Sequence, residues 1–91
     1  MIFWTSAAEM DRELIFERCW RKEGKYAREL DNKILDVVSR LEANPTLGCS
    51  RRRGEDALVG RFMFLQQDKI VICYDVKDGD LVVLRLLPFV D

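Results

Sequence analysis

The chain of 91 residues contains no histidine, and its three cysteines are widely spaced, without a CxxC pair. A zinc site would therefore need three thiolates and a carboxylate, which is a rare ligand set. We expect no metal and no cofactor. Cys19, Cys49 and Cys73 are instead predicted to be small, buried apolar residues in a reducing cytoplasm.

Long apolar stretches are also missing. The longest one, Leu81 to Val90, is interrupted by Arg85 and is too short to span a bilayer. The mostly apolar residues 1–5 are followed at once by charged residues, so we expect no signal peptide. These features predict a cytoplasmic protein without a membrane partner.

The sequence has no excess of either charge, since its formal net charge is −1. Proteins that bind phosphate backbones normally carry a clear positive excess, so the composition does not favour direct binding of nucleic acid. The apolar content of 48% and the charged content of 34% are those of a folded globular protein. We expect one domain that comprises residues 1–91.

The first half of the chain has the pattern of a short strand and a helix. β-branched and aromatic residues predict a strand over Ile2 to Thr5. Ser6 and Glu9 fit a capping box, and the order of charges favours a helix from about Ala7 to Lys22. Gly24 suits a left-handed stop after it. We expect its apolar face to consist of Met10, Leu14, Ile15, Phe16 and Cys19.

A second helix has the clearest periodicity in the chain. Its apolar residues recur at steps of four, four, three, one and three and form one continuous stripe. Asn44 precedes Pro45, which ends the helix there. Because the link between the helices is short, they should form an antiparallel hairpin. The stripe consists of Tyr26, Leu30, Ile34, Val37, Val38 and Leu41.

The second half has the pattern of strands. The polar segment 48–60 is predicted to be a loop with room for a short edge strand. Strands are predicted over Arg61 to Leu65, Lys69 to Val76 and Leu81 to Leu87, and Asp78-Gly79 predicts a hairpin between the last two. The result is an α+β fold of order β-α-α-β-β-β. An antiparallel helical hairpin packs on one face of a small, mainly antiparallel sheet.

Arginines within apolar strands are candidates for partner contacts. Arg61 and Arg85 could each present a cation on one sheet face, or could point outward with the stem covering apolar surface. The sequence leaves both interpretations open. Arg51, Arg52 and Arg53 could form a patch for an acidic partner or for nucleic acid, or could be part of a solvated loop.

The end of the chain offers another candidate contact. Pro88, Phe89 and Val90 would leave an apolar tip exposed, and such tips often mark interfaces. Tyr74 lies inside a predicted strand and is interpreted as a packing residue, not a catalyst. Trp4 and Trp20 are likewise assigned to the core or to helix packing.

Three segments of the first half then suggest a family. They are Tyr26-Ala27-Arg28-Glu29-Leu30, the Ile-Leu-x-x-Val-x-x-Leu pattern from Ile34 to Leu41, and Asn44-Pro45-Thr46-Leu47-Gly48. Together they resemble the second helix and its exit in ParE-type toxins, which belong to the RelE/ParE superfamily of type II toxin–antitoxin systems.

The second half continues this resemblance in order and in length. Arg61, residues 70–76, Asp78-Gly79 and residues 81–87 are similar to the C-terminal strands of that family. The resemblance implies the fold inferred above. ParE-type members inhibit DNA gyrase, RelE-type members cut mRNA in the ribosomal A site, and a cognate antitoxin wraps around both and can extend their sheet. The implied partners are therefore an antitoxin and gyrase, with DNA reached only through the antitoxin.

The choice between the two branches depends on catalytic groups. Cleavage of RNA needs a general base, a general acid and cations near the phosphate. RelE-type sheets carry lysines and arginines on their central strands, but the corresponding positions here are Phe62, Phe64 and Val71. This favours a ParE-like inhibitor without catalytic residues. ParE-type chains commonly have a histidine just after the last strand, where this chain has Pro88. A RelE-like ribosome-dependent endoribonuclease and a non-toxic binding module with the same fold remain the alternatives.

Overall fold

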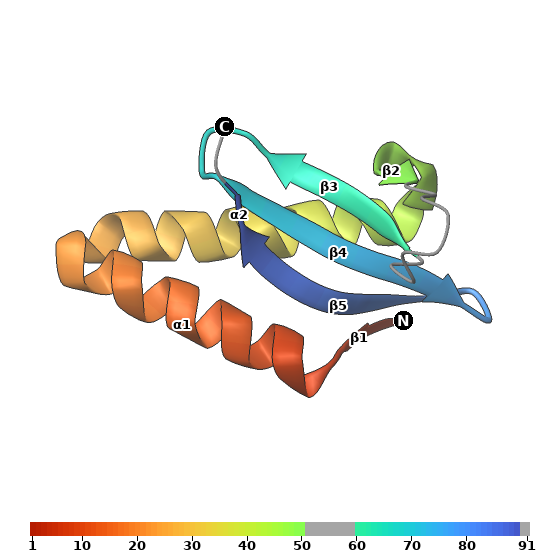
Figure 1. Cartoon of the computed structure of the whole chain (residues 1–91), viewed down its shortest axis with the longest axis horizontal. Helices are drawn as coiled ribbons and strands as arrows, with labels where there is room; N and C mark the ends of the chain where they lie inside the picture. The colour runs from red at the N-terminus through yellow and green to blue at the C-terminus, as the bar shows by residue number, and fades with distance from the viewer. Residues whose placement is uncertain (51–59, 90–91) are drawn as a thin grey trace.

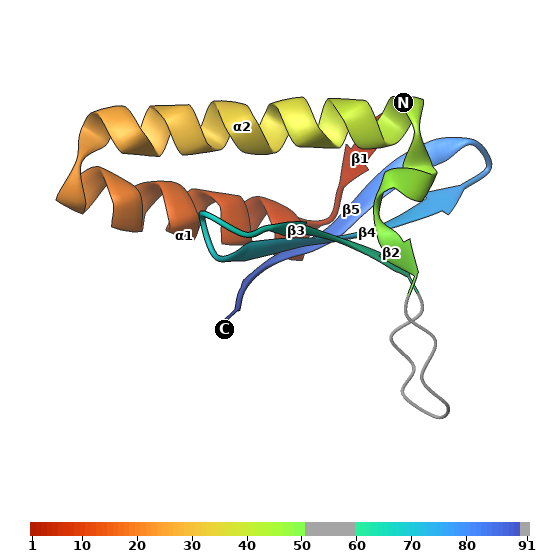
Figure 2. The ribbon, with the colours of Figure 1, turned by 90° about the horizontal axis from the view of Figure 1, so that it is seen from above.

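The computed structural model describes residues 1–50 and 60–89, in which two helices lie on one side of a five-stranded sheet (Figures 1 and 2). The predicted α+β class and the order β-α-α-β-β-β are confirmed, with a two-residue strand added within the predicted loop. The elements are β1 (Ile2–Trp4), α1 (Ser6–Lys22), α2 (Gly24–Ala43), a 3-10 turn (Pro45–Leu47), β2 (Cys49–Ser50), β3 (Arg61–Leu65), β4 (Ile70–Lys77) and β5 (Asp80–Pro88).

The strand order is β1-β5-β4-β3-β2, so β4 is central. Strand β1 pairs with β5 in parallel, and the other pairs are antiparallel. Asp78 and Gly79 have φ values of 52° and 83°. Two consecutive positive φ angles are those of a type I′ turn, so the predicted hairpin is confirmed.

A bulge between β4 and β5 determines which side chains of β5 face the helices. Tyr74 lies opposite Val83, but Cys73 lies opposite Arg85, so Leu84 is an extra residue in β5. Strict alternation would put Val83 and Arg85 on one face. The extra residue instead turns Arg85 out of the core-facing side of the sheet and lets Leu86 join Val83 in the core, where they are 1% and 0% exposed.

Helix α2 covers the sheet with the predicted stripe, except at its first position. Tyr26 is 38% exposed, and its hydroxyl donates a hydrogen bond of 2.8 Å to Asp68 in the turn after β3. Ala27 is buried instead, and Val37 is partly buried. The other stripe residues are at most 3% exposed; they are Leu30, Ile34, Val38 and Leu41.

The apolar face predicted for the first helix is wrong at two positions. Met10 is 63% exposed and Leu14 is 49% exposed. Helix α1 packs on the core through Ala8, Ile15 and Cys19. The helix is rotated in this way because polar groups at its start hold it against the edge of β5.

The capping box predicted at Ser6 is wrong, because the first of these polar groups is the side chain of Thr5. Thr5, not Ser6, is the N-cap, and its Oγ1 accepts a hydrogen bond of 3.1 Å from the Ala8 N–H. The same hydroxyl donates to the Leu84 carbonyl at 2.8 Å, and the Thr5 N–H donates to the Val83 carbonyl at 3.1 Å. The helix begins one residue early because Thr5 ends the ladder between β1 and β5.

The left-handed stop predicted at Gly24 is also wrong. Glu23, in extended backbone, separates the two helices, and Gly24 is the first residue of α2. A Cβ atom there would lie 2.9 Å from Cζ3 of Trp20, so a larger residue would displace the Trp20 ring.

The predicted burial of the cysteines and tryptophans is correct for some of these residues and wrong for others. Cys73 is buried and Cys19 is partly buried, but Cys49 is exposed because it lies on the edge strand β2. Trp4 packs against the core, whereas Trp20 is 48% exposed and stacks on another side chain of α1.

Candidate functional site

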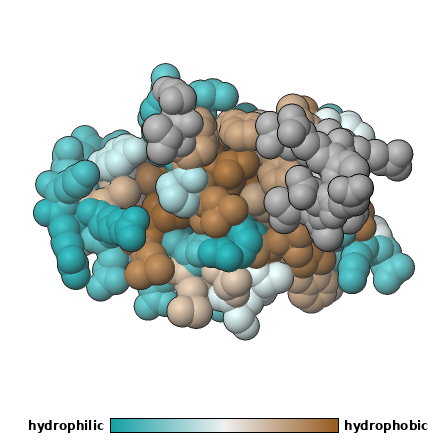
Figure 3. Space-filling model, viewed as in Figure 1, coloured by the Kyte–Doolittle hydropathy of each residue, from teal (hydrophilic) through white to brown (hydrophobic). Residues whose placement is uncertain are grey.

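The sheet has a second apolar face, turned away from both helices. Residues that lie directly opposite one another on neighbouring strands share a face, so the register identifies its members. We call this surface the open face. Figure 3 looks onto it and shows hydrophobic side chains gathered in its middle, with a hydrophilic group among them. It consists of Phe62, Phe64, Val71, Cys73, Arg85, Leu87 and Phe89.

The alternation within β3 explains why both faces are apolar. Met63 and Leu65 pack toward the helices, and Phe62 and Phe64 point the other way. The two phenylalanines are only partly buried. Contiguous apolar surface of this kind marks sites where a protein binds another molecule.

Arg85 is the only charged member of the open face as defined above, and it is engaged within the fold. Its Nε and Nη2 atoms donate to the Asp11 carboxylate at 2.7 and 2.9 Å. One oxygen of Asp11 also accepts the Leu86 N–H at 3.0 Å. Helix α1 thereby covers the edge of β5 beyond the end of β1. The hydrogen bonds from Arg85 lower the pKa of Asp11 below its usual value, and Asp11 raises the pKa of Arg85.

Arg61 and Arg85 do not lie together. Arg61 is opposite Tyr74, on the helix side of the sheet, whereas Arg85 is opposite Cys73 on the open face. Arg61 is partly buried, and its Nη1 lies 3.5 Å from the Gly48 carbonyl oxygen. The two arginines therefore cannot form one cationic site.

The two candidate residues near the end of the chain also differ. Pro88 is exposed and lies opposite Ile70. Phe89 packs edge to face on Phe64, with ring centroids 5.4 Å apart, and its N–H donates to the Lys69 carbonyl at 3.0 Å. Phe89 thus belongs to the open face. The remaining candidates, Arg51, Arg52, Arg53 and Val90, lie outside the described residues.

The central strand carries two groups that could in principle react, and both are held protonated at neutral pH. Tyr74 is fully buried on the helix side, where its hydroxyl donates to the Pro45 carbonyl at 2.5 Å and accepts from the Gly48 N–H at 3.0 Å. Burial raises its pKa. Burial also raises the pKa of the Cys73 thiol. Within residues 1–50 and 60–89, no three side chains of the metal-binding types come together.

Sequence reasoning misses Asp11 as a member of this site. Its partner Arg85 is 74 positions away, and one acidic residue in the first turns of a helix has an ordinary explanation in the helix dipole. Phe62 and Phe64 could have been found, because alternating phenylalanines in a strand that also carries Met63 and Leu65 indicate apolar side chains on both faces.

Comparisons with known proteins agree with this geometry. Residues 2–88 match the family model described as the ParE toxin of the type II toxin–antitoxin system parDE. A solved structure titled as the chromosomal ParDE TA system from P. aeruginosa is similar over 98% of this chain and 95% of that chain, with a TM-score of 0.79 and 20% identity. No curated protein matches the sequence. Among the described residues, no helix has the length and apolar character needed to cross a membrane.

Proposed function

Because the chain belongs to the ParE toxin family of type II toxin–antitoxin systems, we propose that it is a toxin that inhibits DNA gyrase by binding it. We further propose that a cognate antitoxin neutralises it by covering the open face. DNA is then reached only through the antitoxin, and the site of action is the cytoplasm, where gyrase works.

The observation that carries this proposal is the composition of the open face. Phe62 and Phe64 of β3, Leu87 of β5 and Phe89 just after β5 offer partly exposed apolar side chains on both sides of the central strand β4. The cores of protein interfaces are enriched in aromatic residues and poor in free charge. Among the described residues that define this face, the one arginine, Arg85, is already paired with Asp11.

The same face is poorly suited to cutting RNA. Charge develops on the phosphate during cleavage, and cations must lie near it. Phe62, Phe64 and Val71 occupy the positions where RelE-type sheets carry cations, and the Tyr74 hydroxyl faces the opposite side of the sheet. These features support binding in preference to ribosome-dependent cleavage.

A supercoiling assay with purified gyrase tests the proposal. We expect the protein to inhibit supercoiling, and, where an adjacent gene encodes a short protein, we expect that protein to restore activity at equimolar concentration. Primer extension on translated mRNA should show no new ends. Cleaved mRNA with unaffected gyrase would support the RelE-like alternative, and binding of the neighbour without effect on either target would indicate a non-toxic module.

Variants of the open face make the test specific. Phe64→Ala and Phe89→Ala should each weaken antitoxin binding about tenfold or more, because aromatic anchors carry much of the energy of an interface. Leu35→Ala and Leu47→Ala are matched controls, since both residues are exposed on other elements. Equal losses in all four variants would contradict a role for the open face.

A further inference from the structure

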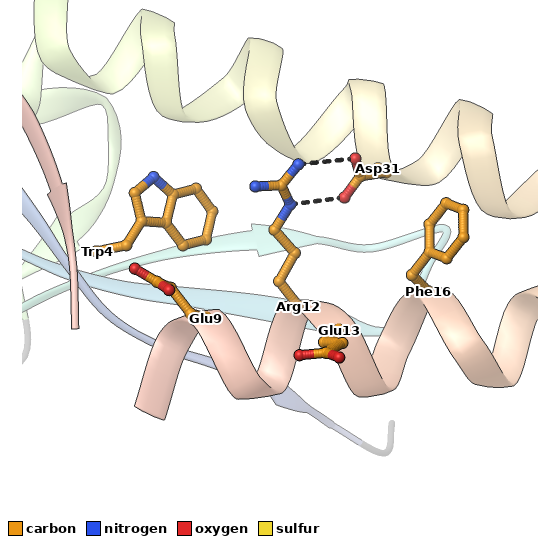
Figure 4. Close-up of a pocket in the computed structure, with 6 residues that line it drawn as sticks. All are labelled: Trp4, Glu9, Arg12, Glu13, Phe16 and Asp31. Atoms are coloured by element: carbon orange, nitrogen blue, oxygen red, sulfur yellow. Dashed lines mark hydrogen bonds and ion pairs between the residues drawn. The ribbon is translucent and has the colours of Figure 1, made fainter. Parts of the chain in front are cut away.

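A second surface lies between the two helices, away from the open face. Trp4, Arg12 and Phe16 line a hollow of about 390 Å³ with Asp31 of α2 on its far side (Figure 4). Past Phe16 the surface continues into a second hollow of about 330 Å³. We call the two hollows the interhelical groove; its lining residues are Trp4, Glu9, Arg12, Glu13, Phe16, Glu17, Trp20, Arg28 and Asp31.

The groove contains both tryptophans of the chain. Phe16 stacks on Trp20 with ring centroids 5.8 Å apart, and Trp20 remains 48% exposed. Trp4 is partly exposed at the opposite end. Large aromatic side chains placed in this way supply contact area with little loss of side-chain entropy on binding.

Each tryptophan ring already contacts an arginine guanidinium of the same chain. The guanidinium carbon of Arg12 lies 5.4 Å from the centre of the Trp4 ring, and that of Arg28 lies 5.4 Å from the Trp20 ring. Arg12 is also fixed by two hydrogen bonds to Asp31, of 2.8 and 2.9 Å. These internal contacts show that the groove accommodates cationic groups against its indole rings.

A row of carboxylates follows the groove along α1. Glu9, Glu13 and Glu17 are four positions apart and exposed, and none forms an ion pair with another described residue. Like charges at this spacing destabilise a helix, and only Glu9 lies in the first turn, where the dipole favours it. With Asp31, the groove has four carboxylates against the guanidiniums of Arg12 and Arg28, so its charge is negative.

We propose that the interhelical groove binds a basic, amphipathic helical segment of a partner protein. The apolar side chains of the segment would pack on the groove's three aromatic rings. Its lysines or arginines, one turn apart, would pair with Glu9, Glu13 and Glu17. Charge complementarity identifies the occupant, because the same carboxylates repel nucleic acid and anionic membranes. This inference does not rest on the toxin proposal, which concerns the other side of the molecule.

Binding of a synthetic peptide to the full chain tests the inference. The probe is a helical peptide of about 15 residues with leucines on one face and lysines one turn apart. The control peptide has the same leucines and glutamates in place of the lysines. We expect the basic peptide to change the intrinsic tryptophan fluorescence, since both indoles lie in the groove, and the acidic peptide to leave it unchanged.

Two charge-matched variants decide whether the groove is responsible. The triple variant Glu9→Gln, Glu13→Gln and Glu17→Gln should bind the basic peptide about tenfold more weakly. The control triple variant Glu29→Gln, Asp36→Asn and Asp78→Asn removes the same charge from exposed positions elsewhere and should bind normally. Circular dichroism confirms that both variants are folded.

Two results would overturn the inference. One is an equal loss of affinity in both triple variants, which would indicate unspecific attraction to an acidic protein. The other is a set of amide shift changes that maps to β3 and β4 instead of α1, which would place the peptide on the open face.

Discussion

The two faces of the sheet are built from the same kinds of residue and differ in what covers them. On the helix side, Ile72, Tyr74 and Val83 are fully buried under the two helices. On the open face, Phe62, Phe64 and Leu87 remain partly exposed. The helix side therefore stabilises the fold, whereas the open face contributes less to stability and is free to contribute to binding.

Neighbouring leucines of β5 should show this contrast most strongly. Leu86 is 1% exposed on the helix side, and Leu87 is partly exposed on the open face. Leu86→Ala should lower the free energy of unfolding by about 2–5 kcal/mol, because it leaves a cavity. Leu87→Ala should lower it by about 1 kcal/mol. Urea denaturation measures both, and equal losses would mean that the two faces do not differ in this way.

Tyr74 forms buried hydrogen bonds on the helix side of the sheet, and a variant without its hydroxyl measures their contribution to stability. Tyr74→Phe removes the hydroxyl that donates to the Pro45 carbonyl and accepts from the Gly48 N–H. Both backbone groups then lose their hydrogen bond to this side chain. We expect a loss of about 1–3 kcal/mol in the free energy of unfolding. Faster amide hydrogen exchange at Gly48 should accompany the loss, and an unchanged exchange rate would argue that the hydroxyl does not hold the 3-10 turn.

Asp11 of α1 contacts Arg85 on the open face and the backbone of Leu86, whose side chain is on the helix side. Asp11→Asn should cost about 1 kcal/mol, since it weakens the contacts with Arg85 and Leu86 at a partly exposed site. Because the folded pKa of Asp11 is lowered, its contribution is present above the unfolded pKa and is lost as the pH falls through the folded value. The stability difference between the wild type and the variant should therefore shrink in acid. A difference that does not change with pH would contradict this origin.

The two tyrosines give the smallest effect and separate two causes of a raised pKa. The hydrogen bond to Asp68 raises the pKa of Tyr26 to about 12, whereas burial raises that of Tyr74. Asp68→Asn should lower the pKa of Tyr26 and leave Tyr74 unchanged, as measured by phenolate absorbance. The contribution of Tyr26 to stability should be complete below its unfolded pKa and be lost as the pH rises through about 12. A shift of both tyrosines would mean that the variant loosens the fold.

Helix α2 was predictable because its apolar stripe has one strong period. Its end was also predictable, because Pro45 disfavours helical backbone angles at the preceding residue. Helix α1 was less so. Its helical periodicity is weak, since apolar residues occur around the whole helix, and the predicted apolar face wrongly includes Met10 and Leu14. Its orientation depends on Thr5 and Asp11, whose partners lie on a strand at the other end of the sequence.

The candidate site was predictable only in part. The apolar end of the chain was expected, and Phe89 does belong to the open face. The roles of Arg61 and Arg85 were left open by the sequence, and the structure places them on opposite sides of the sheet. Single arginines in strands carry no local signal for the face that they occupy.

The sequence by itself determined the elements of this protein, because helical and strand periods, turn residues and proline act over a few neighbouring positions. Only the tertiary structure determined which face of the sheet each side chain occupies. A single extra residue, Leu84, reverses the alternation of β5 and turns Arg85 outward to Asp11. Such a bulge depends on pairing with β4 and on Thr5 binding the freed carbonyl, which are contacts that no local pattern contains.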